Sequence, residues 1–210
     1  MEKLHSAYFN HVASHNFDFN ERHIIYQRVE PKDVGIASNA VVHHIKEEDY
    51  DSILERHNIN PNNQEADDYT HGWNAPHYWK HHCVNHLVAL ENSDADYIVM
   101  ADADCHMLDM TNWVEKGIKL LKDDKSILVV SPNDGTSSRK TMTMSQQLFL
   151  CHRERMLSID FDLPFKGFKD GGPMQEYYWM LEGRIGRYME NNGLFRFILP
   201  EQYRYWHKQF

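Results

Sequence analysis

The sequence predicts an α/β fold: a single domain in which helices flank a mostly parallel β-sheet. Apolar segments of strand length alternate with amphipathic segments of helical length along the chain, which is the pattern of a layered α/β domain. The length of 210 residues, with 41% hydrophobic and 25% charged residues, suits one domain with a proper core.

The first part of the chain predicts two helices and one clear strand. Residues 3–16 carry apolar side chains at helical spacing, and residues 23–29 follow as a strand. Residues 34–45 hold a second apolar stretch, whose type the pattern leaves open. Residues 49–57 predict a short helix, and the polar segment 58–68 predicts a surface loop.

The middle of the chain alternates more regularly. Pro76 suits the first turn of a helix over residues 77–90. A strand follows at residues 96–104, then an amphipathic helix at 111–122 and a strand at 127–131. This order is that of strands joined by helical crossovers.

The last part begins with an apolar strand at residues 145–152 and a glycine-rich loop at 166–173. Residues 175–192 form the next predicted helix, which Gly193 stops. The chain closes with two short predicted strands, residues 195–199 and 203–206.

Charge and composition exclude several classes of protein. The net charge of −9 argues against general binding to nucleic acids or anionic membranes, because both need a positive surface. We expect no targeting leader and no membrane span, since no apolar run approaches the roughly 20 residues required. The three cysteines lie too far apart to indicate a disulfide framework or a zinc knuckle. These features predict a soluble, cytoplasmic protein.

The chain contains 15 histidines. His77 and His81 are four residues apart, as are His82 and His86, so either pair could share a helix face and bind zinc. No carboxylate or cysteine stands at a fixed spacing from them, which favours ordinary hydrogen-bonded or solvated imidazoles.

Residues 96–104 point most directly to chemistry. The apolar run 97–100 is of the kind buried in a parallel sheet, and it delivers Asp102 and Asp104 to the end of the strand. Two carboxylates one residue apart can converge on one hard cation. Mg²⁺ and Mn²⁺ prefer such oxygen ligands and are usually shared with phosphate.

The Asp102-Ala103-Asp104 sequence resembles the DxD motif of glycosyltransferases with the GT-A fold, a Rossmann-like sheet flanked by helices. A terminal His207, following Tyr205-Trp206, resembles the strand-end histidine that completes the metal site in many family 2 members. Further segments in the family's order are residues 83–85 before 96–97, 145–155, 159–162, 171–172 and 175–179.

The resemblance implies a metal-dependent transfer of a sugar from a nucleoside-diphosphate sugar to an acceptor hydroxyl. Asp104, with help from Asp102 and His207, would hold Mn²⁺ or Mg²⁺ against the leaving phosphates. The donor would be a nucleoside-diphosphate sugar, with a UDP-sugar first among them. The acceptor is unknown, and self-association of the chain is left open.

The resemblance also assigns the remaining donor site and the base. Glu176, at the start of the predicted helix, would take the proton of the acceptor in an inverting reaction. Gly171 and Gly172 would let the backbone approach the substrates, and Trp179 would form an apolar wall for a sugar ring. Each has a structural alternative: Glu176 as a first-turn acid that complements the helix dipole, and Trp179 as a core residue.

One part of the family pattern is missing. The chain begins at what would be the family's first helix, so the first strand is absent, displaced or supplied by another chain. In this scheme residues 1–95 form the nucleotide-binding part, and residues 96–210 form the metal and acceptor part.

Two other functions fit parts of the pattern. A truncated, non-catalytic relative would bind a metal or a partner protein, and the missing strand favours that interpretation. A nucleotidyltransferase also uses paired carboxylates on a metal, but the glycine-rich phosphate loop and lysine expected near its N-terminus are not seen.

Overall fold

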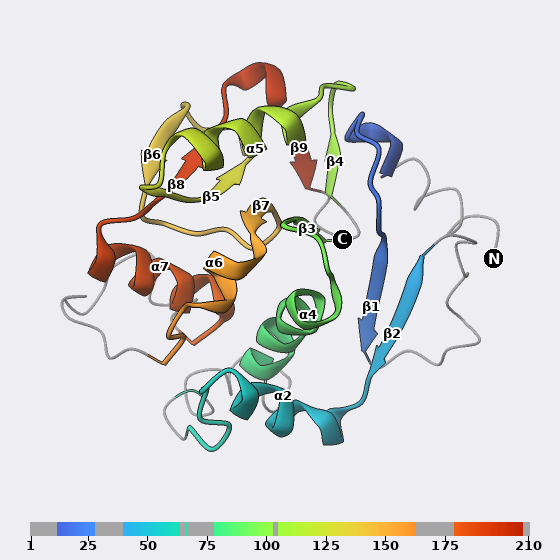
Figure 1. Cartoon of the computed structure of the whole chain (residues 1–210), viewed down its shortest axis with the longest axis vertical. Helices are drawn as coiled ribbons and strands as arrows, with labels where there is room; N and C mark the ends of the chain where they lie inside the picture. The colour runs from blue at the N-terminus through green and yellow to red at the C-terminus, as the bar shows by residue number, and fades with distance from the viewer. Residues whose placement is uncertain are drawn as a thin grey trace.

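The computed structural model describes residues 12–27, 40–63, 66, 78–102, 105–162 and 179–207. Within them, helices flank a five-stranded sheet, so the predicted α/β class is confirmed at that level (Figure 1). The order of strands across the sheet is β3 (Tyr97–Ala101), β7 (Leu148–His152), β5 (Ile127–Ser131), β8 (Phe195–Ile198) and β6 (Arg139–Thr141).

The main sheet is mixed, so the prediction of a mostly parallel sheet is wrong for it. Only β5 and β8 pair in parallel, whereas β7 is antiparallel to both β3 and β5, and β6 is antiparallel to β8. Helix α5 (Trp113–Asp123) joins β3 to β5, and such a crossover makes two strands parallel. The chain then returns without a helix, so β7 enters antiparallel between them.

The sheet separates two hydrophobic cores, and β7 shows this by strict alternation. Leu148 and Leu150 pack in the core that α5 covers, while Phe149 and Cys151 pack in the opposite core. Gly117 brings α5 close to the sheet, because a Cβ there would lie only 2.6 Å from Leu150 Cδ2.

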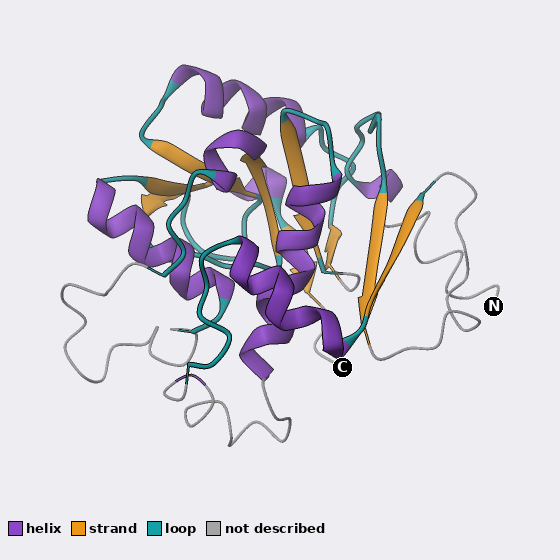
Figure 2. Cartoon of the chain, turned by 60° about the horizontal axis from the view of Figure 1, so that its bottom comes forward, coloured by secondary structure: helices purple, strands orange, loops and turns teal. Residues whose placement is uncertain are grey.

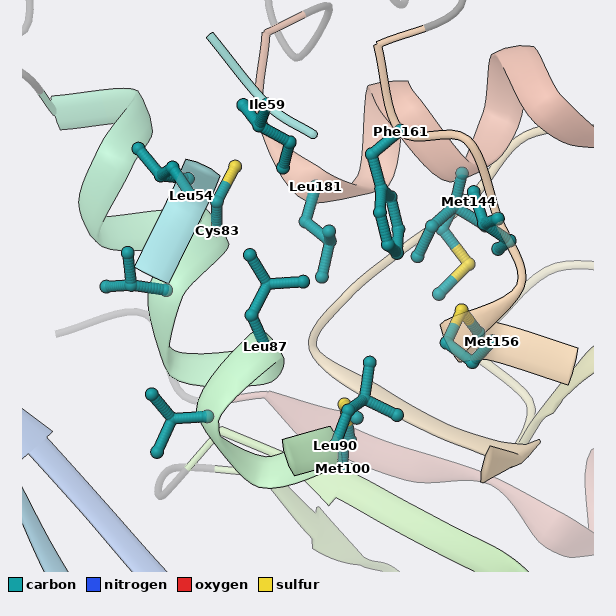
Figure 3. Close-up of a cluster of buried hydrophobic side chains, with 14 of the residues drawn as sticks. Leu54, Ile59, Cys83, Leu87, Leu90, Met100, Met144, Met156, Phe161 and Leu181 are labelled. Carbon is teal, nitrogen blue, oxygen red and sulfur yellow. The ribbon is translucent and has the colours of Figure 1, made fainter. Parts of the chain in front are cut away.

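The larger core lies on the face opposite α5. Helices α2 (Tyr50–Arg56), α4 (Tyr78–Asn92), α6 (Arg153–Leu157) and α7 (Leu181–Asn192) contribute its helical side chains. Figure 3 shows Leu87 and Leu90 of α4 in the same cluster as Leu181 of α7 and Met100 of β3. Helix α4 therefore packs against the end of β3 on the face of the larger core.

Strands β1 (His23–Gln27) and β2 (Val41–Ile45) form a separate parallel pair. Figures 1 and 2 show this pair set to one side of the main sheet. Helix α4 contacts both β1 and β3, yet within the described residues β3 pairs only with β7.

The edge position of β3 corrects one sequence prediction. Tyr97, Ile98 and Val99 are only half-buried, in contrast to β5, which is buried along its whole length. The expected burial of the apolar run is met only at Met100, because one edge of β3 has no neighbouring strand among the described residues.

Several predicted boundaries also move. The predicted strand 96–104 ends at Ala101, and the predicted helix 175–192 begins at Leu181, since Trp179 and Met180 precede it in non-helical conformation. The stretch 34–45, whose type the sequence left open, ends in β2. Residues 12–14 are helical, whereas residues 3–11 lie outside the described part.

The elements that the sequence did not predict are β4 (Cys105–Met107), β6, α6 (Arg153–Leu157) and the 3₁₀ turns η2 (Glu47–Asp49) and η5 (Glu201–Tyr203). None of the helices in the described ranges is long and apolar enough to cross a membrane.

Candidate metal centre

Asp102 stands directly after the end of β3, where the sequence predicted it. Its backbone N–H donates to Gln147 O at 2.8 Å, which continues the β3–β7 ladder by one bond. Its carbonyl accepts a hydrogen bond from Cys105 N at 3.0 Å, which closes a tight turn. Cys105 is thereby held beside Asp102 at the start of β4.

The last strand of the chain, β9 (Tyr205–His207), brings His207 to the same place. It pairs antiparallel with β4, and His207 lies directly opposite Cys105 in the register. Directly opposite residues of an antiparallel pair project from the same face, with Cβ atoms about 5 Å apart. The Tyr205 hydroxyl donates to Gln147 Oε1 at 3.0 Å, which ties β9 to the segment that also holds Asp102.

One ligand atom from each of Asp102, Cys105 and His207 lies within 4.8 Å of the other two. Cys105 is fully buried, while Asp102 and His207 are half-buried, so the cluster is open to solvent on one side. A carboxylate, a thiol and an imidazole in this arrangement can hold a cation. The structure therefore brings together two of the three sequence-predicted ligands, Asp102 and His207.

Cys105 is the ligand that sequence reasoning missed. A cysteine without a spaced partner carries no metal-binding signal, and its partner here lies on a distant strand. Asp104, which the resemblance made the main ligand, lies outside the described residues.

A second carboxylate, Glu182, is near enough to Asp102 to be affected by its charge. It stands in the first turn of α7 and is only 8% exposed, and its Oε2 accepts a hydrogen bond from Gln146 N at 3.1 Å. Burial, reinforced by the nearby negative charge of Asp102, raises the pKa of Glu182 to about 7. Counting back from Gly193 by a mean helix length of about 11–12 residues would have found this first-turn acid.

Gln146 links Glu182 to helix α4. Its side-chain amide donates to His82 Nδ1 at 2.6 Å, and its carbonyl is within 3.4 Å of His86 Nε2. Burial lowers the pKa of His82 to about 4, so this ring is neutral and its Nδ1 accepts the hydrogen bond from the amide. Gln146 itself is 6% exposed, and its Oε1 has no hydrogen-bond partner in the described part of the chain.

The other sequence-predicted residues are not placed at this cluster. Trp179 packs half-buried against the larger core, with its ring centroid 5.8 Å from the Arg184 guanidinium carbon. That position agrees with its structural alternative, and its contact with a sugar stays a prediction. Glu176, Gly171 and Gly172 lie outside the described residues.

A pocket of about 320 Å³ opens beside the cluster. Trp206, on its wall, is 50% exposed although it is a large apolar side chain. The residues that line the pocket are Leu108, Asp134, Gln147, Arg204, Tyr205, Trp206 and His207. His207 thus faces both the cluster and the pocket.

A scan of the chain against models of protein families gives no match, and a search of curated proteins gives none either. Any function must therefore be argued from the site itself. Asp102 belongs to the set of candidate ligands with Cys105 and His207. Its charge also raises the pKa of the buried Glu182, which accepts a hydrogen bond from Gln146 N.

Proposed function

We propose that this protein is a metal-dependent glycosyltransferase that moves a sugar from a nucleoside-diphosphate sugar to an acceptor hydroxyl. The observation that carries the proposal is the convergence of Asp102 and His207 at the end of β3. These are two of the residues that the DxD resemblance assigns to the metal.

Asp102, His207 and Cys105 would hold the metal, with Asp104 as the further ligand that the resemblance implies. The bound metal would supply positive charge against the leaving diphosphate. The residues of the chain fix where this charge sits, because Asp102 is tied to β7 and His207 to β4 by backbone pairing. Such fixed placement is what electrostatic stabilisation of a transition state requires.

Two carboxylates are candidates for the base. The resemblance assigns the role to Glu176. Glu182 is supported by its place in the first turn of α7 and by its hydrogen bond to Gln146 N. The next residue, Gln147, accepts a hydrogen bond from the backbone N–H of Asp102. A carboxyl with a pKa near neutrality can exchange a proton at working pH.

The test is calorimetric titration with UDP and other nucleoside diphosphates, with and without divalent metal. We expect binding that needs metal and that weakens at least about tenfold in Asp102→Ala. Asp109→Ala removes an exposed carboxylate just beyond β4 and serves as the matched control. Absence of binding to every nucleoside diphosphate would contradict the proposal.

Turnover then separates the two candidate bases. Hydrolysis of the sugar nucleotide whose base binds would be compared in Glu182→Gln and Glu176→Gln. The variant of the true base should lose kcat by about 10²-fold or more while nucleotide binding is kept. If both variants keep the activity of the unaltered chain, neither Glu182 nor Glu176 is the base.

A non-catalytic binding role is the second candidate, and it is favoured by the edge of β3 that pairs with no strand among the described residues. An unpaired strand edge is a template for a strand from another chain. The cytoplasmic location predicted from the sequence stays a prediction.

A further inference from the structure

The ligand atoms of the cluster disagree with the magnesium or manganese that the resemblance implies. Mg²⁺ takes oxygen ligands in near-octahedral geometry, and carboxylate, carbonyl and water suit Mn²⁺ as well. The described cluster instead offers one oxygen, one nitrogen and one sulfur donor. Sulfur is a soft ligand that selects zinc-like metals over magnesium.

We infer that Asp102, Cys105 and His207 form a site for a thiophilic divalent cation, with zinc as its natural occupant. The inference rests on the proposed function in that both need a metal at this cluster. It goes beyond that function in naming the metal, and metal binding can be measured without nucleotide or sugar.

Backbone hydrogen bonds position Cys105 and His207 in the metal-free chain. Cys105 and His207 are directly opposite in the β4–β9 ladder, so their side chains share one face. Asp102 is held by hydrogen bonds of its own N–H and carbonyl, the latter to Cys105 itself. The cluster is therefore built from regular backbone pairing rather than from surface side chains that happen to meet.

The spacing fits a small tetrahedral ion. Bonds of about 2.0–2.3 Å to oxygen, nitrogen and sulfur place two ligands of tetrahedral zinc about 3.5 Å apart. The three atoms here lie within 4.8 Å of one another, so small side-chain rotations would close the site. Three protein ligands leave a fourth position for water or a phosphate oxygen, as catalytic zinc sites do.

The other two cysteines make a contrast within the same chain. Cys83 and Cys151 are as buried as Cys105, but both lie in the larger core and neither belongs to the cluster. Cys151 donates through Sγ to Ile98 O at 3.8 Å, inside the larger core. Cys151→Ser therefore changes a buried thiol that is not part of the cluster, and it is the matched control for Cys105→Ser.

The test uses the full chain, kept reduced with a non-thiol reductant and freed of metal with a chelator. Co²⁺ is the probe, because a cobalt–thiolate bond gives a charge-transfer absorption band that oxygen and nitrogen ligands do not. We expect one equivalent of Co²⁺ to produce the band, Zn²⁺ to abolish it by displacement, and a large excess of Mg²⁺ to leave it in place.

The variants decide whether the cluster is the site. Cys105→Ser should lose the band and weaken Co²⁺ binding by at least about 100-fold, since even an outer-shell change costs 10–100-fold. Cys151→Ser should keep both. His207→Ala, which alters a half-buried residue near the surface, gives a second reading if circular dichroism shows that Cys105→Ser does not fold.

Each remaining outcome overturns the inference. Absence of a charge-transfer band in the unaltered chain excludes the sulfur ligand. A band that persists in Cys105→Ser or keeps its strength in His207→Ala places the metal elsewhere. Displacement of Co²⁺ by Mg²⁺ or Mn²⁺ as readily as by Zn²⁺ removes the thiophilic preference. Failure of nucleotide binding, by contrast, contradicts the transferase and leaves the zinc site standing.

Discussion

Cys105 and His207 face each other across the β4–β9 ladder, and Asp102 closes the turn that leads into β4. The proposed metal site thus depends on how firmly β9, the last described strand, is held. Asn133 supplies much of that hold: its N–H donates to Tyr203 O, and its carbonyl accepts from Tyr205 N. Side-chain atoms of Asn133 add three further hydrogen bonds.

Replacing Asn133 should therefore weaken both the fold and the metal site. Asn133 is 1% exposed, and its side chain bonds Thr136 O, Leu199 O and Gly135 N. Asn133→Ala leaves those groups unpaired, so we expect a loss of about 2–3 kcal/mol in the free energy of unfolding by urea. Co²⁺ affinity should fall in the same variant.

Asn192→Ala is the control for that experiment. Asn192 also donates a side-chain hydrogen bond, to Tyr188 O, but it is exposed at the end of α7. Its replacement should change stability by no more than about 0.5 kcal/mol. Equal losses of unfolding free energy in Asn133→Ala and Asn192→Ala would mean that the buried hydrogen bonds of Asn133 stabilise the fold no more than an exposed one.

Glu182 should make stability fall with rising pH when metal is absent. Its pKa rises from an ordinary value of 4.5 to about 7 on folding, mainly through burial. The folded state therefore binds the proton more tightly, so this contribution is complete below about pH 4.5 and is lost as pH rises to about 7. The loss is on the order of 3 kcal/mol.

Unfolding curves in chelator across this range check the prediction. The difference in unfolding free energy between the unaltered chain and Glu182→Gln, which keeps an oxygen for Gln146 N, should shrink by this amount as pH rises from about 4.5 to about 7. The difference for Glu190→Gln, on the exposed side of α7, should stay constant. A constant difference for Glu182→Gln would contradict the prediction.

His82 should act in the opposite direction over nearly the same pH range, so each contribution is read from its own variant and not from the slope of the unaltered chain. Burial lowers its pKa from 6.5 to about 4, so its contribution to stability is present above about pH 6.5 and is lost as pH falls to about 4. We expect its ring to stay neutral at pH 5 in an NMR titration of the folded chain. The difference in unfolding free energy between the unaltered chain and His82→Gln should shrink by about 3 kcal/mol as pH falls from about 6.5 to about 4. A ring that gains its proton near pH 6.5 would contradict this account.

The sequence predicted the position of Asp102 because a short apolar run has one clear end. It placed β5 at its observed bounds, Ile127–Ser131, for the same reason. The start of α7 was harder, since its N-cap residue is Met180, which makes no side-chain capping bond. Without a capping signal, the predicted helix was extended back to residue 175.

The pairing of Cys105 with His207 could not be predicted from local pattern. β4 and β9 are three residues each, too short for a periodic signal. The insertion of β7 between β3 and β5 is equally non-local, because strand order depends on which edges meet in space. Asp102 was predicted from the end of a strand, and His207 from the family resemblance. Cys105 was recognised as a candidate ligand only when the fold placed it beside them.

The backbone of β3 shows which of its amides face away from β7, toward the edge that pairs with no described strand. Asp102 N donates to Gln147 O, and Asp96 O accepts from Arg153 N, so alternate residues of this parity face β7. The amides of Ile98 and Met100 therefore point into the β3–β7 ladder, and those of Tyr97, Val99 and Ala101 point to the other edge.

Amide hydrogen exchange should divide β3 along this alternation. Because no described strand pairs with the far edge, Val99 and Ala101 should exchange at least about 100-fold faster than Met100, the equivalent of about 3 kcal/mol of protection. Site-resolved NMR exchange on the isolated chain measures it, with Val129 and Val130 of fully buried β5 as the protected reference. Equally slow exchange of both sets would show that another strand covers β3, and the binding role would lose its main support. Fast exchange that slows when a second polypeptide is added would favour that role over turnover by the isolated chain.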